Sequence, residues 1–168
     1  MNNFKSILFF LILVSLSRLI PHPPNFTPLL SIAIFLPFLL EDKRIVLILP
    51  LAVLLITDFF LGSYNLMLWV YGSMLLISGI SFYFYFNSLK RLTVLSLIAP
   101  SLFFIVTNFG VWLGSSNYSQ DLPGLLLCYY YAIPFYAMNL ISTLLFSITF
   151  FVIFKLFINK KELSDASY

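Results

Sequence analysis

The chain has 168 residues, of which 61% are apolar types and only 9% are charged. Because a soluble domain usually carries about 25% charged residues, this chain lacks the polar side chains needed to cover a water-facing surface. The net charge of +3 comes from short basic runs between apolar stretches, which argues against nucleic acid as a partner. The single cysteine, Cys128, excludes an internal disulfide and a metal site built from several cysteines.

Six apolar stretches predict membrane-spanning helices, each of which needs roughly 20 residues, with a range of about 17 to 25. The expected spans are residues 4–20, 28–40, 45–61, 66–86, 92–113 and 134–158. The second of them is short for a span. The expected fold is therefore all-α: one transmembrane domain over residues 1–168, a polytopic bundle of six helices in a lipid bilayer.

The connections between the spans contain turn and helix-start signals. Thr27 followed by Pro28 predicts an N-cap and a first-turn proline at the start of the second span. Residues 115–132 form the longest expected connection, which carries Pro123 and Gly124. This connection has room for a lid or a short interfacial helix.

Basic residues predict the orientation, since cytoplasmic loops carry an excess of Lys and Arg. Eight of the nine fall on one side of a six-span chain: Lys5, Lys43, Arg44, Lys90, Arg91, Lys155, Lys160 and Lys161. The ninth, Arg18, ends the first span on the other side. Both termini are therefore expected in the cytoplasm. A cleaved signal peptide, which would leave five spans, remains open because Lys5, an apolar run, Ser15 and Ser17 also fit one.

Polar and aromatic residues of the spans gather near the expected outer membrane face. A charge at the bilayer centre costs about 2.5–3.5 kcal/mol on the insertion scale, so such residues suggest a function. The candidate ligand-binding residues are Arg18, His22, Asn25, Asp58, Trp69, Asn108, Trp112 and Tyr129. Their convergence predicts a binding site for a small molecule at the outer face.

Several of these candidates have a purely structural alternative. Arg18 and Asp58 are expected to form an ion pair, which is either a clasp between the first and third spans or a site for a ligand's charge. His22 lies between prolines and is either solvated or in contact with a ligand. Asn108 and Trp112 are four residues apart on one helix face. They offer a polar handle and a stacking wall for a planar ligand, although Trp112 alone is typical of an interface anchor.

Small and polar residues within the spans predict helix contacts. Asn139, Thr143 and Ser147 recur every four residues in the sixth span, which favours hydrogen bonds between helices. Gly110 and Gly114 have the same spacing, which permits close helix approach.

The chemistry of common enzymes is missing from the sequence. It contains no His-Glu-x-x-His, no Gly-x-Ser-x-Gly and no phosphate-binding glycine loop. It has no second histidine, no carboxylate pair within the spans and no chain of acidic residues for a proton relay. We therefore expect no enzyme activity, no bound metal and no cofactor.

Five pieces of the sequence carry a family resemblance. They are RLIPHPPNFTP at 18–28, TDFFLG at 57–62, TNFGVW at 107–112, GLLLCY at 124–129 and IPF at 133–135. Together they resemble a family of small bacterial six-helix membrane proteins of unknown function. That family is in turn similar to the substrate-binding S components of energy-coupling-factor vitamin transporters.

The resemblance implies a multi-pass protein of the bacterial inner membrane that binds a vitamin-like molecule at its outer face for uptake. Residues 21–27, 62–65 and 115–132 would close over the ligand, and an energy-coupling transmembrane subunit with ATPases would be the partner. The first span lacks the spaced alanines with which many S components dock, so uptake by this protein alone remains open. The alternative is a non-transporting membrane scaffold or assembly partner, in which the outer residues would pack together without a cavity.

Overall fold

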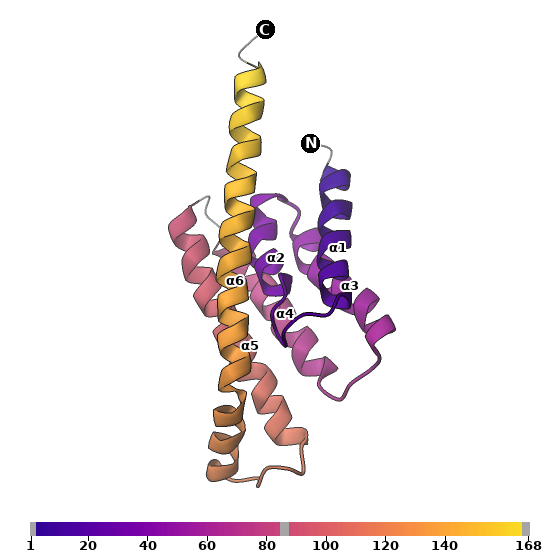
Figure 1. Ribbon diagram of the computed structural model, residues 1–168, viewed down its shortest axis with the longest axis vertical. Helices are drawn as coiled ribbons and strands as arrows, with labels where there is room; N and C mark the ends of the chain where they lie inside the picture. The colour runs from indigo at the N-terminus through magenta and orange to yellow at the C-terminus, as the bar shows by residue number, and fades with distance from the viewer. Residues whose placement is uncertain (1–2, 85–87, 166–168) are drawn as a thin grey trace.

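A computed structural model describes residues 3–84 and 88–165, with side chains described for residues 8, 11–84 and 88–156. Within these residues the regular secondary structure is helical, without a strand. The elements are α1 (Asn3–Leu19), α2 (Leu29–Phe35), the 3₁₀ helix η1 (Leu36–Phe38), α3 (Lys43–Leu61), α4 (Met67–Tyr83), α5 (Leu89–Gly114) and α6 (Leu122–Asp165). They pack side by side in a bundle from which the end of α6 projects (Figure 1). The predicted all-α fold is confirmed.

Three helices among the described residues are long and apolar enough to cross a membrane. They are α3, α5 and the part of α6 from Leu122 to Leu156. Shorter apolar helices are formed by α4 and by α2 with η1. This pattern is consistent with a membrane protein, while the number of six spans stays a prediction.

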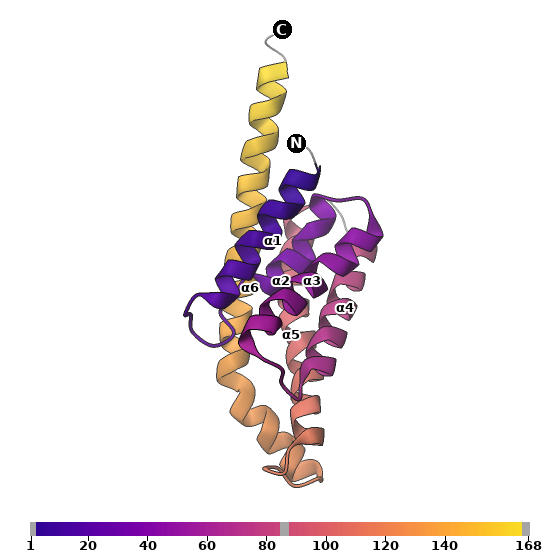
Figure 2. The same ribbon diagram turned by 90° about the vertical axis from the view of Figure 1, so that its right-hand side faces the viewer.

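The short helix α2 lies in the middle of the bundle. It contacts α3, α4, α5 and α6, and every one of its residues is buried. Figure 2 shows it surrounded by longer helices. Together α2 and η1 rise by about 16 Å, roughly half of the ~30 Å hydrocarbon core of a bilayer. The central helix therefore fills only part of the bundle's depth.

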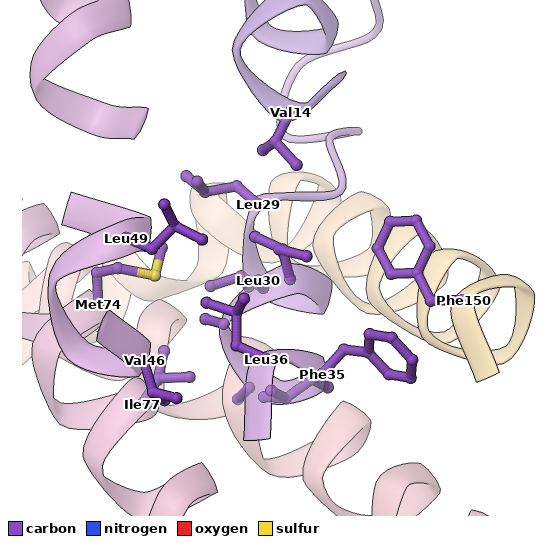
Figure 3. Close-up of a cluster of buried hydrophobic side chains, with 14 of the residues drawn as sticks. Val14, Leu29, Leu30, Phe35, Leu36, Val46, Leu49, Met74, Ile77 and Phe150 are labelled. Atoms are coloured by element: carbon purple, nitrogen blue, oxygen red, sulfur yellow. The ribbon is translucent and has the colours of Figure 1, made fainter. Parts of the chain in front are cut away.

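Aromatic packing holds α2 against α6. The ring of Phe35 stacks on Phe38 at 5.1 Å between centroids and meets Phe150 and Phe154 of α6 at 5.7 and 5.8 Å. Figure 3 shows Phe35 and Phe150 in the core cluster around α2. Pro37 lacks the N–H that would bond to the carbonyl four residues earlier, so the helix tightens into the 3₁₀ turn at Leu36–Phe38.

The termini and the connections between the helices lie at two opposite ends of the bundle. The chain termini, the end of α4 and the start of α5 lie at one end, while the connections 20–28, 62–66 and 115–121 lie towards the other, which we call the distal end (Figures 1 and 2). At the first end, Lys43 of α3 donates to the Tyr83 hydroxyl of α4. The side chains of Lys5, Lys160 and Lys161 lie outside the described residues. Both termini thus share one end, and the compartment that this end faces is a prediction.

The start of α6 differs from the prediction. The helix begins at Leu122 rather than at residue 134, so the expected connection 115–132 shrinks to 115–121. Oδ1 of Asp121 accepts from the N–H of Gly124 at 2.9 Å, which is the N-cap interaction. Pro123 then falls in the first turn, where no helical hydrogen bond is lost. The Pro-Gly pair that suggested a loop belongs to this first turn.

Other boundaries need smaller corrections. Thr27 is not the N-cap of α2, because Pro28 occupies that position and its carbonyl accepts from the N–H of Ile32 at 2.9 Å. Helix α4 ends at Tyr83, and the last predicted residues of that span, 85–86, lie outside the described residues. Helix α5 begins at Leu89, three residues before the predicted span.

Candidate functional site

A cavity of about 390 Å³ lies at the distal end of the bundle, where α2 begins. It is bounded by the end of α1, the 20–28 connection and the distal parts of α3, α4, α5 and α6. Its polar lining residues are Arg18, His22, Asn25, Thr27, Tyr64, Thr107, Asn108, Tyr136 and Asn139. The cavity exists because α2 starts only at Leu29 and leaves the distal part of the bundle axis without a helix. Its volume falls in the range of ligand pockets, about 300–1,000 Å³.

An ion pair closes one side of the cavity. Nη2 of Arg18 lies 2.9 Å from Oδ1 of Asp58, and the two side chains are 15% and 2% exposed. Nη1 of Arg18 also donates to the hydroxyl of Thr57. The predicted pair is therefore present, and it joins the end of α1 to α3. Arg18 lines the cavity, whereas Asp58 does not.

The second carboxylate oxygen of Asp58 is also occupied. The hydroxyls of Tyr64 and Tyr71 donate to Oδ2 at 3.2 and 3.0 Å. Burial, together with the neighbouring Asp58 carboxylate, raises the pKa of Tyr64, so its hydroxyl keeps the proton that it donates. The carboxylate thus connects α1, α3, the 62–66 connection and α4 in one cluster with no net charge.

Two amide side chains face the cavity from neighbouring helices. Nδ2 of Asn108 donates to the carbonyl of Phe104 at 2.8 Å, which leaves its Oδ1 as an acceptor. Asn139 on α6 is only 9% exposed, and no described residue hydrogen-bonds to its side-chain amide. Its backbone carbonyl, by contrast, accepts from Ser142 and Thr143. The amides therefore offer both donors and acceptors to a molecule in the cavity.

The 20–28 connection contributes further polar groups. Asn25 has a φ of 61°, a left-handed conformation that Asn tolerates better than most residues. Its carbonyl accepts from the hydroxyl of Ser142 at 3.3 Å, which ties the connection to α6. His22 is exposed, and its Nδ1 lies 2.8 Å from the carbonyl of Pro23. Because a carbonyl only accepts, Nδ1 is the donor and Nε2 remains available.

Three predicted site residues stabilise the fold away from the cavity. Trp69 packs so tightly on Gly110 that a Cβ there would lie 2.3 Å from its Cγ. Nε1 of Trp112 donates to the carbonyl of Ser119 at 2.9 Å. The Tyr129 hydroxyl donates to a backbone carbonyl of α5, that of Ile105, at 2.7 Å.

The position of Trp112 has a geometric reason. Four residues along a helix add about 6 Å of rise and 40° of rotation. Trp112 therefore lies one turn beyond Asn108, against the 115–121 connection instead of the cavity. Of the predicted residues, the structure brings together Arg18, His22, Asn25 and Asn108 around the cavity.

Asn139 is the most informative lining residue that the sequence did not assign to the site. It was expected to join Thr143 and Ser147 in hydrogen bonds between helices. The structure instead makes such a bond from the hydroxyl of Ser31 on α2 to the carbonyl of Thr143 at 3.1 Å. One signal was available: Asn139 is the only Asn or Gln in residues 134–158, and an amide needs more partners than a hydroxyl. Tyr64, Thr107 and Tyr136 were also missed.

The site offers binding chemistry. Among the described residues, no group of three or more His, Cys, Asp and Glu side chains is placed to hold a metal ion. The Cys128 thiol is buried and points to the carbonyl of Asn108 at 3.5 Å, where it helps to join α6 to α5. Hydrogen-bonding amides beside apolar walls suit the recognition of a small molecule.

The fold and the cavity define the class of protein: an all-α bundle with membrane-length apolar helices and a partly polar cavity at one end. The chain belongs to the Family of unknown function (DUF6580), which matches residues 1–165. Searches of curated proteins and of solved structures found no match. The comparisons thus show a family for the chain but give no support for similarity to S components.

Proposed function

We propose that this protein binds a small molecule in the distal cavity and takes part in its uptake across a membrane. The observation that carries the proposal is the side-chain amide of Asn139, which lines the cavity and has no hydrogen-bond partner among the described residues. Both the oxygen and the NH₂ group of this amide are therefore available to hydrogen-bond to a ligand in the cavity.

The proposed topology has six spans in the bacterial inner membrane, with both termini in the cytoplasm and the distal end outside. Lys43 and Arg44 at the start of α3, and Lys90 and Arg91 at the start of α5, lie at the end opposite the cavity. At the distal end, the charge of Arg18 is balanced by Asp58. This distribution follows the positive-inside rule. It would place the cavity where a nutrient arrives.

Coupling to an energy source is a separate question from binding. A transmembrane subunit with ATPases as partner, and a vitamin-like substrate, rest on the sequence resemblance alone. The competing function is a scaffold, for which the distal residues should pack against one another. Trp69, Trp112 and Tyr129 do pack in this way, but the cavity beside Asn139 is unexpected for a scaffold.

The proposal is tested by small molecules that co-purify with the protein. Val111 lines the cavity, and Val111→Phe should occupy part of it. Leu113 is 53% exposed on the same helix, so Leu113→Phe is a matched control. We expect mass spectrometry of extracts from the detergent-solubilised protein to find a molecule with the wild type and with Leu113→Phe, but not with Val111→Phe. No specific molecule from several expression hosts, or equal recovery with all three proteins, would contradict the proposal.

A further inference from the structure

We infer that the cavity selects an uncharged molecule with a flat apolar body and an amide-type edge, such as a carboxamide or a lactam, over its carboxylate analogue. This inference rests on the proposed binding function and names the chemical class of the ligand. It depends on which polar groups around the cavity are already engaged and which are free.

The charged groups are engaged. The guanidinium of Arg18 is held by Asp58 and by the hydroxyl of Thr57. The other oxygen of Asp58 is held by Tyr64 and Tyr71. Asp58 already neutralises Arg18, so the pair offers a carboxylate ligand no net positive charge. A carboxylate that displaced Asp58 would leave a side chain that is only 2% exposed without its charge partner. The pair therefore disfavours an anion in the cavity.

The two amides at the cavity are neutral and have free polar atoms. A carbonyl can only accept, so the contact with Phe104 fixes Nδ2 of Asn108 against it and leaves Oδ1 for the cavity. Asn139 has both its oxygen and its NH₂ group available, since no described residue hydrogen-bonds to its side chain. A second amide is the natural complement of such a group, because each supplies one donor and one acceptor.

The remaining walls are apolar and partly aromatic. Leu54 and Val70 line the cavity from α3 and α4, and Phe103 and Phe104 line it from α5. The ring of Phe104 lies 4.9 Å from that of Tyr136 on α6. These surfaces suit a flat apolar body, and they offer no charged partner for an ammonium group.

The inference is tested by saturation-transfer NMR on the full chain in detergent micelles, with the signal from empty micelles subtracted. The probes are benzamide and benzoate, which share a ring and differ in charge at pH 7. We expect a benzamide signal at least fivefold above that of benzoate. Asn139→Leu has nearly the same shape as the wild type but no polar atoms, and it should reduce the benzamide signal at least fivefold. Thr149→Val, at an exposed position of α6, should leave it unchanged.

Several results would overturn the inference. They are a benzoate signal equal to that of benzamide, a benzamide signal that survives Asn139→Leu, and no benzamide signal from the folded wild type. Asn139→Ala is a second variant in case Asn139→Leu fails to fold, as judged by size-exclusion chromatography. If an anionic molecule co-purifies in a Val111-dependent manner, the ligand class is wrong while the binding function stands. If nothing co-purifies and neither probe binds, both are wrong.

Discussion

At the scale of single residues, Asp58 organises the distal end. Both of its oxygens have partners, and these partners come from α1, the 62–66 connection and α4. A buried ion pair is weak evidence for net stability, but the removal of one partner typically costs about 3–5 kcal/mol because a charge is left without compensation. Asp58 should therefore be much less replaceable than its neighbours.

Asp58→Asn is expected to lower the free energy of unfolding by an amount within that range of about 3–5 kcal/mol. The double variant Arg18→Met/Asp58→Leu should lose less than the sum of its two single variants, since no charge is stranded. Thermal and denaturant unfolding in detergent would measure the wild type and the four variants. Strictly additive losses, or an unchanged midpoint for Asp58→Asn, would show that the pair is not coupled.

Gly110 of α5 packs directly against the Trp69 ring of α4. A Cβ on Gly110 would meet the Trp69 ring at 2.3 Å, whereas a Cβ on Gly114 would meet nothing within 4 Å. Gly110→Ala should therefore destabilise the protein by about 1–3 kcal/mol, the usual cost of overpacking. Gly114→Ala should be neutral or slightly stabilising. The same unfolding measurements apply, and equal effects of the two variants would argue against this packing.

At the scale of elements, the first turn of α6 depends on Asp121. Hydrogen bonds from the Ser119 hydroxyl and from the N–H of Gly124 lower the pKa of Asp121. A lowered pKa in the folded state means that this stabilisation is present above the ordinary aspartate pKa and is lost as the pH falls through the lowered value. The start of α6 should thus fray in acid.

Amide hydrogen exchange at Gly124, corrected for its intrinsic pH dependence, would measure this fraying. We expect protection at neutral pH that falls in acid for the wild type. Asp121→Ala should remove the protection at all pH values. Asp121→Asn, which can still cap, should keep it without the pH dependence. Identical profiles for the wild type and Asp121→Asn would contradict the role of the carboxylate.

The sequence predicts the existence of the helices better than their ends. Apolar length alone places α1, α3 and α5 close to where they lie, because a lipid-embedded helix must be long and apolar. The start of α6 is missed because Pro123-Gly124 also fits a turn. The hydrogen bonds from the N–H groups of Gly124 and Leu125 to Asp121 distinguish the two. The central position of α2 is invisible in sequence, since burial on all sides leaves no periodic pattern.

At the scale of the whole molecule, the sequence predicts that polar residues gather at one end but not which of them face inward. The depth of a residue in the membrane follows from its position along the span. The direction in which its side chain points depends on the rotation of the helix about its axis, which the sequence of a uniformly apolar helix does not reveal. Asn108 and Trp112 illustrate this, since one lines the cavity and the other anchors a connection. Asn139 lines it as well, beside the start of α2.

The proposed topology predicts which connections are accessible from outside the cell. In a Cys128→Ala background, single cysteines at the exposed positions Ser63 and Ser116 should react with a membrane-impermeant maleimide in intact cells. A cysteine at Asp42, also exposed but at the opposite end, should react only after permeabilisation. Labelling of the cysteine at position 42 in intact cells would contradict the proposed orientation. It would show that this end faces outward and that the cavity faces the cytoplasm.

We propose that the distal space beside Asn108 and Asn139 holds a small molecule. The most direct measurement is an experimental density map of the protein purified from its native membrane. We expect density for a compact, non-protein molecule within hydrogen-bonding distance of both amides. A map in which Phe103, Phe104 and Tyr136 fill that space, with the two amides bonded to the protein itself, would contradict it.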